Sequence, residues 1–404
     1  MLKQVQGGVC AAKGFSANGV HCGIRKNKTK LDLALIYSEK QASAASVYTQ
    51  NLVKGAPLTV TKNNIANGKA QAIICNSGNA NTCNANGIEI ATQTCELLAK
   101  ELGICPTDVV VASTGVIGQP LDITPIANGI PALVKGLGAH SDLACEGIMT
   151  TDTRPKEIAF EFVVGGKTCR IGGIAKGSGM IHPNMATMLV FVTTDCAISD
   201  EMLKKALSAD VKDSFNMISV DGDTSTNDMV SVLANGMAEN EEITCDGTGY
   251  DAFCKALNAV TTYLCREIAK DGEGATKLLE CKVCGGKTTE IAKIVAKSVI
   301  CSSLFKAAMF GADANWGRVL CAIGYAGVDV DVNKVDVAFR SVKGEIAVCK
   351  NGAGVEFSEE KAKEILLEQE IEVLIALNDG DGKATAWGCD LTYDYVKING
   401  DYRT

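Results

Sequence analysis

The segment Ala175–Val192 (AKGSGMIHPNMATMLVFV) holds the residue whose surroundings most favour covalent chemistry. A loop of small residues leads to Ala186 and Thr187, and an apolar, strand-like run follows directly. A threonine hydroxyl is a weak nucleophile unless a base lies beside it, and cutting the chain before the threonine supplies that base as a new α-amine. An α-amine, with a reference pKa of about 8, takes and returns a proton near neutrality. A threonine at such a junction is more often an ordinary β-branched strand residue, so Thr187 is a candidate nucleophile.

A second segment offers the complementary group for acyl transfer. Residues Val109–Gly118 (VVVASTGVIG) form a β-rich run that ends in a turn rich in hydroxyl groups and glycine. Glycine exposes backbone N–H groups, and such a donor stabilises the oxyanion of a tetrahedral intermediate by about 3 kcal/mol. The same pattern is also typical of a strand that ends in a tight turn. The turn is therefore a candidate oxyanion hole with a plain structural alternative.

Other nucleophile and nucleotide motifs are incomplete. His21, His140 and His182 are too far apart in the sequence for a paired metal motif, and no GxSxG elbow nominates a serine for a Ser-His-Asp triad. The run Gly172–Gly179 has glycine where a phosphate loop requires serine or threonine after its lysine. The sequence therefore supports neither a serine triad nor a nucleotide site.

Two segments resemble metal sites only in part. Residues Asp221–Asp228 (DGDTSTND) lack the glycine at position six and the glutamate at position twelve of a calcium loop, so a polar turn is the simpler interpretation. Cys281 and Cys284 form a single CxxC without the second pair or nearby histidine that completes a zinc site. We predict that the protein has no metal centre.

Short β-rich runs alternate along the chain with segments of helical periodicity. The runs with strand character are Asp32–Ser38, Gln71–Asn76, Asp108–Ala112, Ile158–Val164, Met188–Thr193, Val335–Phe339 and Ile371–Leu377. Two amphipathic helices are predicted, over residues 88–102, ending at Gly103, and over residues 253–268. A hairpin is predicted at the turn 341–344. This mixture favours a layered α+β sandwich over a purely parallel sheet.

Composition narrows the classes of partner. The chain has 404 residues, a formal net charge of −8 and scattered lysines, which makes nucleic acid and anionic membranes poor candidate partners. Neither a secretory signal nor an apolar run of membrane-spanning length is present, so we expect a cytoplasmic protein. In that compartment the 18 cysteines are expected to be reduced thiols that fill the core.

Eight segments carry a resemblance to a known family along nearly the whole chain. They are Asn76–Asn81 (NSGNAN), Ser113–Gly118 (STGVIG), Thr150–Thr153 (TTDT), Lys176–Ile181 (KGSGMI), Pro183–Leu189 (PNMATML), Asp221–Asp228 (DGDTSTND), Asn315–Arg318 (NWGR) and Asn399–Thr404 (NGDYRT). The chain resembles ornithine acetyltransferase, the glutamate N-acetyltransferase of the cyclic arginine pathway, also called the ArgJ family. It departs from the family pattern at Ala312 and Ala314, where arginine and proline are expected.

The resemblance implies a precursor that cuts itself between Ala186 and Thr187. The products would be an α chain of residues 1–186 and a β chain of residues 187–404 that stay together, with Thr187 as the new amino terminus. The implied fold is an αββα sandwich like that of N-terminal nucleophile hydrolases. The implied assembly is a dimer of αβ units, α2β2.

The resemblance also implies the site residues. Thr187 would be the nucleophile, and Thr114 and Gly115 would form the oxyanion hole. The residues at substrate-binding positions of the family are Thr150, Lys176, Thr187, Glu273, Asn399 and Thr404. A lysine, a glutamate and polar donors are the side-chain types that bind the carboxylate and amine of an amino acid. Without the resemblance, Glu273 reads as a solvated turn residue and the chain end as frayed.

The implied reaction is ping-pong transfer of an acetyl group from N2-acetylornithine to glutamate through an acetyl-threonine. It needs no cofactor, because one amide is exchanged for another through the acyl-enzyme. The sequence leaves open whether acetyl-CoA is a second donor. Two rivals also remain: a self-processed amidohydrolase or aminopeptidase, in which water takes the acyl group, and a binding protein in which Thr187 is structural.

Overall fold

Strands in the first 234 residues have buried side chains on both faces, which is typical of a sheet that is covered on both sides. The computed structural model describes residues 2–182 and 188–401. In it all of these strands except the short one at Ile218–Ser219 form one nine-stranded sheet in the order β1–β6–β7–β8–β10–β3–β4–β5, with β2 paired to β3. Their bounds are β1 Lys3–Val5, β2 Phe15–Val20, β3 Leu33–Tyr48, β4 Lys69–Asn79, β5 Val109–Val116, β6 Lys156–Val164, β7 Lys167–Lys176, β8 Leu189–Thr194 and β10 Met229–Ala234.

The long strand β3 connects two parts of this sheet. Residues 33–38 pair with β2, whereas residues 43–48 pair with β10 on the same edge. On the other edge the register with β4 shifts between Tyr37 and Ala42, where residues 39–41 are exposed. An irregularity of this kind bends a strand and increases its twist. The bend allows β2, β4, β5 and the first half of β3 to lie over the rest of the sheet.

Three hydrophobic clusters define the order of the layers. Ile36 of β3 and Phe191 of β8 lie in one buried cluster, between the two parts of the sheet. Their neighbours point the other way, since side chains alternate along a strand: Leu35 packs in the cluster formed with α2 and α3, and Val192 in the cluster formed with α5 and α6. The layers therefore follow one another as helix, sheet, sheet, helix. This confirms the predicted α+β class and its αββα sandwich.

The helices of these outer layers begin and end at recognisable residues. Asp122 and Ser199 cap α3 and α5 by accepting a hydrogen bond from a backbone N–H of the first turn. Gly103 ends α2 in the left-handed conformation, at φ 70°, as predicted. The bounds are α1 Ala56–Asn64, α2 Gly87–Leu102, α3 Ile123–Lys135, α4 Ser141–Ile148, α5 Asp200–Asp210 and α6 Thr248–Lys270.

A second sheet has seven strands in the order β14–β13–β12–β15–β11–β16–β9. The bounds of its strands are β9 Ile218–Ser219, β11 Leu278–Gly286, β12 Asp336–Ser341, β13 Gly344–Lys350, β14 Ala353–Gly354, β15 Glu370–Ala376 and β16 Gly382–Cys389. The helices that follow β11 in the sequence are α7 Thr289–Cys301, α8 Ser303–Phe310, α9 Trp316–Gly324, α10 Glu359–Leu366 and α11 Tyr393–Asp401. Short 3₁₀ turns cover Gly8–Cys10, Ile65–Asn67, Pro106–Asp108, Phe215–Met217 and Val332–Lys334.

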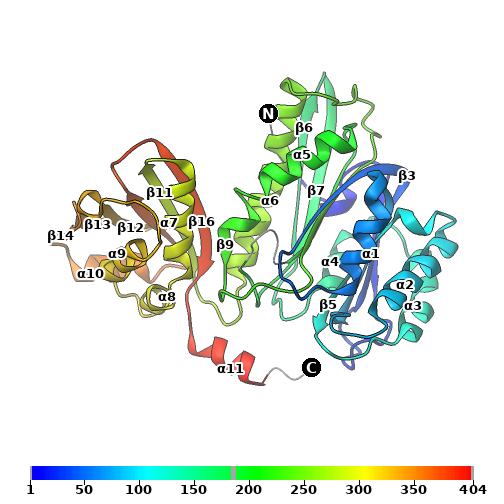
Figure 1. Cartoon of the computed structure of the whole chain (residues 1–404), viewed down its shortest axis with the longest axis horizontal. Coiled ribbons are helices and arrows are strands. Elements are labelled where there is room, and N and C mark those ends of the chain that lie inside the picture. The colour runs from blue at the N-terminus through cyan, green and yellow to red at the C-terminus, as the bar shows by residue number, and fades with distance from the viewer. Residues whose placement is uncertain (1, 183–187, 402–404) are drawn as a thin grey trace.

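Helix α6 joins the two sheets into one body. It packs on β6 and β7 of the first sheet and also contacts β11 and β16 of the second. Figure 1 shows the second sheet with α7–α10 as a separate lobe beside the larger sandwich, and α11 leading from that lobe toward the sandwich. The buried cluster around α6 is continuous between the lobes. Their relative position is therefore fixed by packing and not by a linker.

The predicted elements are all present, with differences at their ends. The seven predicted strands correspond to β3, β4, β5, β6, β8, β12 and β15, and the two predicted helices to α2 and α6. The predicted hairpin is β12–β13. The predicted strand ends at Ser38, ten residues before β3 itself ends at Tyr48. The polar residues 39–41 look like a turn in the sequence, although they only mark the irregularity in the pairing with β4.

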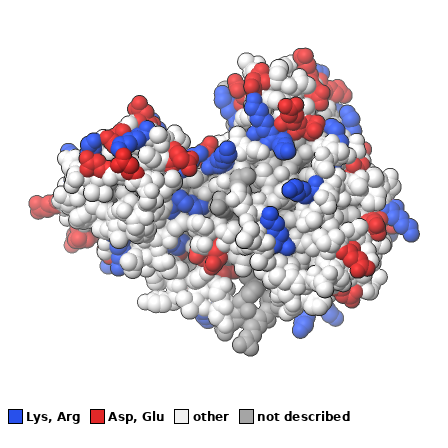
Figure 2. Space-filling model, viewed as in Figure 1, with Lys and Arg blue, Asp and Glu red and all other residues white. Residues whose placement is uncertain are grey.

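Charged side chains of both signs are mixed over the surface. On the face in Figure 2, lysines and arginines alternate with acidic residues on both lobes, and a notch separates the lobes at the top of the view. This agrees with the scattered lysines of the sequence. Within residues 2–182 and 188–401, none of the helices combines the length and the apolar character that crossing a bilayer requires.

Candidate active site

A small polar cavity of about 140 Å³ brings most of the predicted site residues together. Thr114 and Gly115 reach it from the end of β5, and Lys176 from the end of β7. The other predicted residues in its lining are Thr150, Glu273 and Asn399. Residues far apart in the sequence thus converge on one cavity at the end of the layered strands.

Three predicted residues, Ala186, Thr187 and Thr404, lie outside the described residues. The residues that follow Thr187 in the sequence lie beside the cavity. Leu189, the first residue of β8, is paired with Lys176 of β7, and the Met188 carbonyl accepts a hydrogen bond of 2.9 Å from the Met229 N–H. The start of β8 therefore lies next to a residue that lines the cavity.

The turn at the end of β5 requires a glycine and is held from the side by an amide. Gly115 has φ 129°, and a Cβ on it would come within 2.3 Å of the Gly78 carbonyl carbon on β4. The Asn227 side chain donates to the Ser113 carbonyl at 2.9 Å and to the Ala80 carbonyl at 2.5 Å. The strand end and the loop before β10 are therefore locked together.

The Thr114 hydroxyl lies 3.3 Å from the ammonium of Lys176. Both side chains are buried. A hydroxyl, a glycine backbone and an ammonium in one small cavity are suited to stabilise a developing negative charge.

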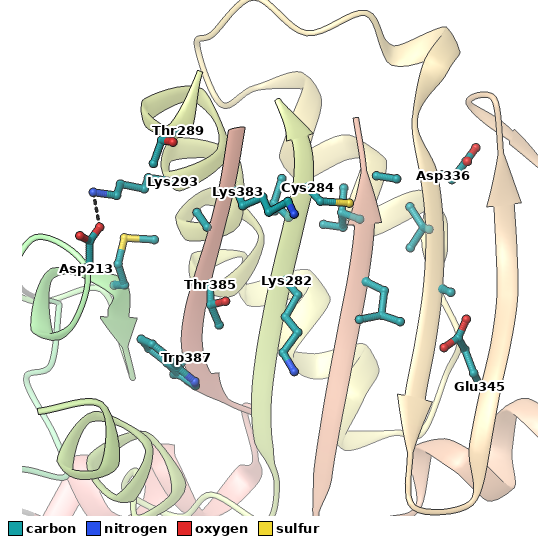
Figure 3. Close-up of a pocket in the computed structure, with 18 of the residues that line it drawn as sticks. Asp213, Lys282, Cys284, Thr289, Lys293, Asp336, Glu345, Lys383, Thr385 and Trp387 are labelled. Atoms are coloured by element: carbon teal, nitrogen blue, oxygen red, sulfur yellow. Dashed lines mark ion pairs between the residues drawn. The ribbon is translucent and has the colours of Figure 1, made fainter. Parts of the chain in front are cut away.

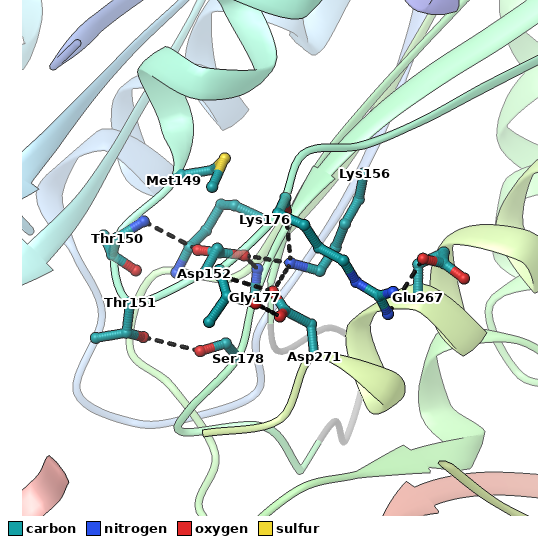
Figure 4. A network of polar contacts seen from close by, with 12 residues as sticks. Met149, Thr150, Thr151, Asp152, Lys156, Lys176, Gly177, Ser178, Glu267 and Asp271 are labelled. Carbon is teal, nitrogen blue, oxygen red and sulfur yellow. Dashed lines mark hydrogen bonds and ion pairs between the residues drawn. The ribbon is translucent and has the colours of Figure 1, made fainter. Parts of the chain in front are cut away.

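A buried ionic network fixes three of the segments that line the cavity (Figure 4). The Lys156 ammonium is fully buried and lies 2.7 Å from Asp152 and 2.5 Å from Asp271. The same Asp152 carboxylate accepts hydrogen bonds from the backbone N–H groups of Thr150, at 2.9 Å, and Gly177, at 2.7 Å. The Thr150 loop, the end of β7 and the end of α6 are thereby held at one point.

The charges in this network keep Asp152 ionised. Burial alone would raise the pKa of Asp152, but the ammonium groups of Lys156 and Lys176 outweigh it and lower the pKa to about 2. Asp228, at the start of β10, is different, because burial raises its pKa well above the ordinary range and no nearby cation compensates fully. Lys176 therefore interacts with two buried acidic side chains whose pKa values are shifted in opposite directions.

Glu273 and Asn399 form the other wall of the cavity. The Glu273 N–H donates to the Ser178 carbonyl at 2.9 Å, which fixes the turn after α6. The Asn399 amide, from α11, donates to the Glu273 carboxylate at 2.8 Å. Helix α11 is therefore pinned to the cavity by a polar contact, and Glu273 is not merely a solvated turn residue.

The acidic segment 221–228 forms a polar turn, as predicted from its failure to match a calcium loop. The Asp221 carboxylate accepts hydrogen bonds from the N–H groups of Met180, at 2.6 Å, and Ile181, at 2.9 Å. The Tyr395 hydroxyl of α11 donates to the same carboxylate at 3.3 Å. The Asp221 side chain therefore fixes the backbone of the loop that contains Met180, a residue that also lines the cavity.

The sequence did not reveal the residues that position the site. Asp152 and Asn227 stand within recognised motifs, but nothing there indicated that their side chains hold backbone groups of the cavity wall. Lys156 and Asp271 lie outside every motif. A buried pair separated by 115 residues in the sequence leaves no local pattern, since only the folded chain brings the two charges together.

A larger hollow lies elsewhere and contains none of the predicted residues. It has a volume of about 1040 Å³ and lies on the open face of the second sheet, where Lys282, Thr385 and Trp387 line it (Figure 3). An ion pair between Lys293 and Asp213 borders it on the side of α7. Acyl transfer requires a few polar groups around a small site, whereas this hollow is large and has an apolar floor.

The layered fold and the small polar cavity together define an α+β enzyme with a site suited to acyl transfer. Comparison with known proteins identifies the family. The chain belongs to the ArgJ family, whose model matches residues 16–404. The arginine biosynthesis bifunctional protein ArgJ of Caldanaerobacter subterraneus subsp. tengcongensis is 50% identical to it over 405 aligned residues, which cover 100% of each chain.

Solved structures match parts of the chain. The crystal structure of the arginine biosynthesis bifunctional protein ArgJ from Bacillus halodurans is 47% identical with a TM-score of 0.50, and the match covers 52% of this chain and 98% of that chain. The ornithine acetyltransferase of Mycobacterium tuberculosis, solved in complex with ornithine, is 35% identical with a TM-score of 0.43, and the match covers 46% of this chain and 100% of that chain.

Proposed function

We propose that this protein transfers the acetyl group of N2-acetylornithine to glutamate through an acetyl-threonine on Thr187, within arginine biosynthesis. The observation that carries the proposal is the convergence of Thr114, Gly115, Lys176 and Glu273 on one cavity beside the start of β8. Full-length similarity to proteins named for arginine biosynthesis supports the pathway.

The roles follow from the chemistry of the side chains. Thr187 attacks the acetyl carbonyl, and its own α-amine takes the hydroxyl proton and returns it to the departing ornithine amine. The Thr114 hydroxyl and the Gly115 N–H hold the oxyanion, and the Lys176 ammonium, 3.3 Å from that hydroxyl, strengthens the positive potential there. Glutamate then enters and takes the acetyl group by the reverse path.

Recognition of the amino-acid substrates falls to the remaining residues. The Glu273 carboxylate pairs with the amine of ornithine, and its contact with Asn399 orients it. The hydroxyl of Thr150 and the terminal Thr404 supply further polar contacts. The reaction is proposed to need no cofactor, because the two amides are nearly equal in free energy.

Self-cleavage between Ala186 and Thr187 creates the α-amine that this mechanism requires. The Bacillus halodurans structure supports a divided chain, since 52% of this chain covers 98% of the chain in that crystal. We propose chains 1–186 and 187–404, assembled as α2β2 in the cytoplasm. The word bifunctional in the relatives' names makes acetyl-CoA the second acetyl donor to examine.

Intact mass under denaturing conditions tests the proposal. We expect two polypeptides in place of one 42.3 kDa chain, the second beginning with threonine. Thr187→Ala should remain one chain and lose acetyl transfer, whereas Thr187→Ser should retain some cleavage because a hydroxyl persists. Full transfer by uncut Thr187→Ala would overturn the mechanism.

Product analysis separates transfer from hydrolysis. Acetylglutamate that forms only when glutamate is supplied supports the transferase. Acetate released at the same rate with and without glutamate would instead identify an amidohydrolase of the same fold.

A further inference from the structure

Helix α11 brings Asn399 to the candidate active site, although the helix has little buried surface of its own. It leads from the second lobe toward the sandwich (Figure 1), and Asn399 lines the cavity there. Among residues 393–400, Tyr395 is half-buried and all the others are exposed. A helix of nine residues is too short to be stable in water by itself. The place of Asn399 in the cavity therefore depends on the contacts that attach α11 to the rest of the chain.

The turn after α6 attaches the beginning of α11. The Thr392 hydroxyl, directly before the helix, donates to the Gly274 carbonyl at 2.6 Å. The two backbones are so close that a Cβ on Gly274 would come within 2.6 Å of the Tyr395 nitrogen. These contacts fix the first turn of α11, whereas Asn399 lies near its other end.

Tyr395 connects this first turn to Asn399 and to a second attachment. Its hydroxyl donates to the Asp221 carboxylate at 3.3 Å. Its backbone carbonyl accepts a hydrogen bond of 3.0 Å from the Asn399 amide, and the same amide donates to Glu273 at 2.8 Å. A continuous series of hydrogen bonds thus runs from Asp221 through Tyr395 and Asn399 to Glu273.

Asp221 is a fixed acceptor for the Tyr395 hydroxyl. Its carboxylate also accepts hydrogen bonds from the backbone N–H groups of Met180, at 2.6 Å, Ile181, at 2.9 Å, and Asp223, at 3.3 Å. Burial, and next the Asp221 charge, raise the pKa of Tyr395 above its ordinary value. The hydroxyl therefore keeps its proton and remains a donor at neutral pH.

From these contacts we propose that Tyr395 and Asp221 are positioning residues for the amino-acid substrates, because they hold α11 where Asn399 orients the Glu273 carboxylate. The inference rests on the proposed function, in which Glu273 pairs with the substrate amine. Molecules with α11 detached lack the complete site, so the apparent affinity falls in proportion to the attached fraction. Bound substrate favours the attached state, and the chemical step at saturation is unchanged.

Steady-state kinetics of the cut enzyme test the proposal. Tyr395→Phe removes only the hydroxyl and should raise the KM for N2-acetylornithine about fivefold, with kcat nearly unchanged, because a hydrogen bond to a charged acceptor is lost. Tyr393→Phe is the matched control, since it removes the same atom from a ring on the same helix that is 84% exposed. It should leave both constants unchanged. An unchanged KM in Tyr395→Phe, or a fall in kcat alone, would overturn the proposal.

A double-mutant cycle tests whether Tyr395 acts through Asp221. Asp221→Asn removes the charge that strengthens the hydrogen bond, so it should also raise KM. The double variant should have no higher KM than the more affected single variant, because one contact is lost in each case. Asp223→Asn, at an exposed position of the same turn, is the control and should leave KM unchanged. Increases in KM that multiply in the double variant would show that the two residues act separately.

Trypsin cleavage after Lys397 reports the attachment of α11 without relying on activity. Lys397 is exposed on this helix, and proteolysis there requires the helix to open locally. Release of residues 398–404, followed by mass, should be about fivefold faster in Tyr395→Phe than in Tyr393→Phe, in proportion to the opened fraction. Equal rates in the two variants would overturn the attachment by Tyr395, whatever the reaction. A difference in rates without any acetyl transfer by the unmodified protein would instead overturn the proposed function.

Discussion

His182 is held in an environment that disfavours its charged form. Burial first, and the Lys297 ammonium second, lower its pKa from an ordinary value of 6.5 to about 4. The unfolded chain therefore binds a proton below pH 6.5 that the folded chain does not bind until about pH 4. By linkage, this residue's contribution to stability is complete above pH 6.5 and is lost as the pH falls toward 4.

We accordingly expect the free energy of unfolding to depend on His182 between pH 7 and pH 5. Urea unfolding of Thr187→Ala, a single chain, is the reference. The additional change His182→Gln should flatten the loss of stability on acidification, because glutamine does not titrate. An equally steep loss with and without His182 would show that other groups cause the dependence.

At the scale of single residues, the sequence predicts part of the site but not every contact between side chains. The family resemblance implies Thr114, Gly115, Lys176 and Glu273 as site residues, and the structure brings them to one cavity. The contact of 3.5 Å between the Cys301 sulfur and Nδ1 of His182 has no such signal. It exists only because α7 ends beside the segment that follows β7, and neither residue's neighbours in sequence indicate the other.

At the scale of elements, the sequence pattern predicts those strands and helices that pack regularly against a neighbouring layer. The helical periodicity over residues 253–268 correctly predicts α6, because one face of this helix packs on β6 and β7 and another face contacts the second sheet. The continuation of β3 was not predictable, because its polar residues 39–41 are exposed at an irregularity. Tertiary pairing with β10 decides that conformation, not local propensity.

The network around Lys156 is expected to matter to several elements at once. Lys156→Met would leave the carboxylates of Asp152 and Asp271 buried without their cation, which costs about 3–5 kcal/mol of stability. Urea unfolding measures this. Arg170→Met is the matched control, because it removes an ion pair with Glu161 that is partly exposed to solvent and contributes under about 1 kcal/mol.

A second variant distinguishes lost charge balance from lost packing. Lys156→Met combined with Asp271→Asn removes one of the two stranded charges and should recover part of the stability. If the double variant is no more stable than Lys156→Met, the apolar packing of the lysine chain, and not the ionic network, would be the source of the loss.

The whole molecule is built so that a cut before Thr187 would not release a separate domain. Strands β1–β7 precede the proposed cut, and β8 and β10 follow it. In the sheet, however, β8 and β10 lie between β7 and β3. Six residue pairs join β7 to β8, and six join β10 to β3.

The two proposed chains are therefore expected to behave as one particle. Separating them would break both ladders and expose the buried clusters on the two faces of β8, to which residues such as Phe191 and Val192 contribute. Gel filtration of the cut protein in native buffer should give one peak at the volume of uncut Thr187→Ala. In 6 M guanidinium, well above the transition range of ordinary domains, the two chains should separate. Two peaks in native buffer would mean that the sheet does not hold the chains, and that the strands on either side of the cut pair more weakly than the ladders indicate.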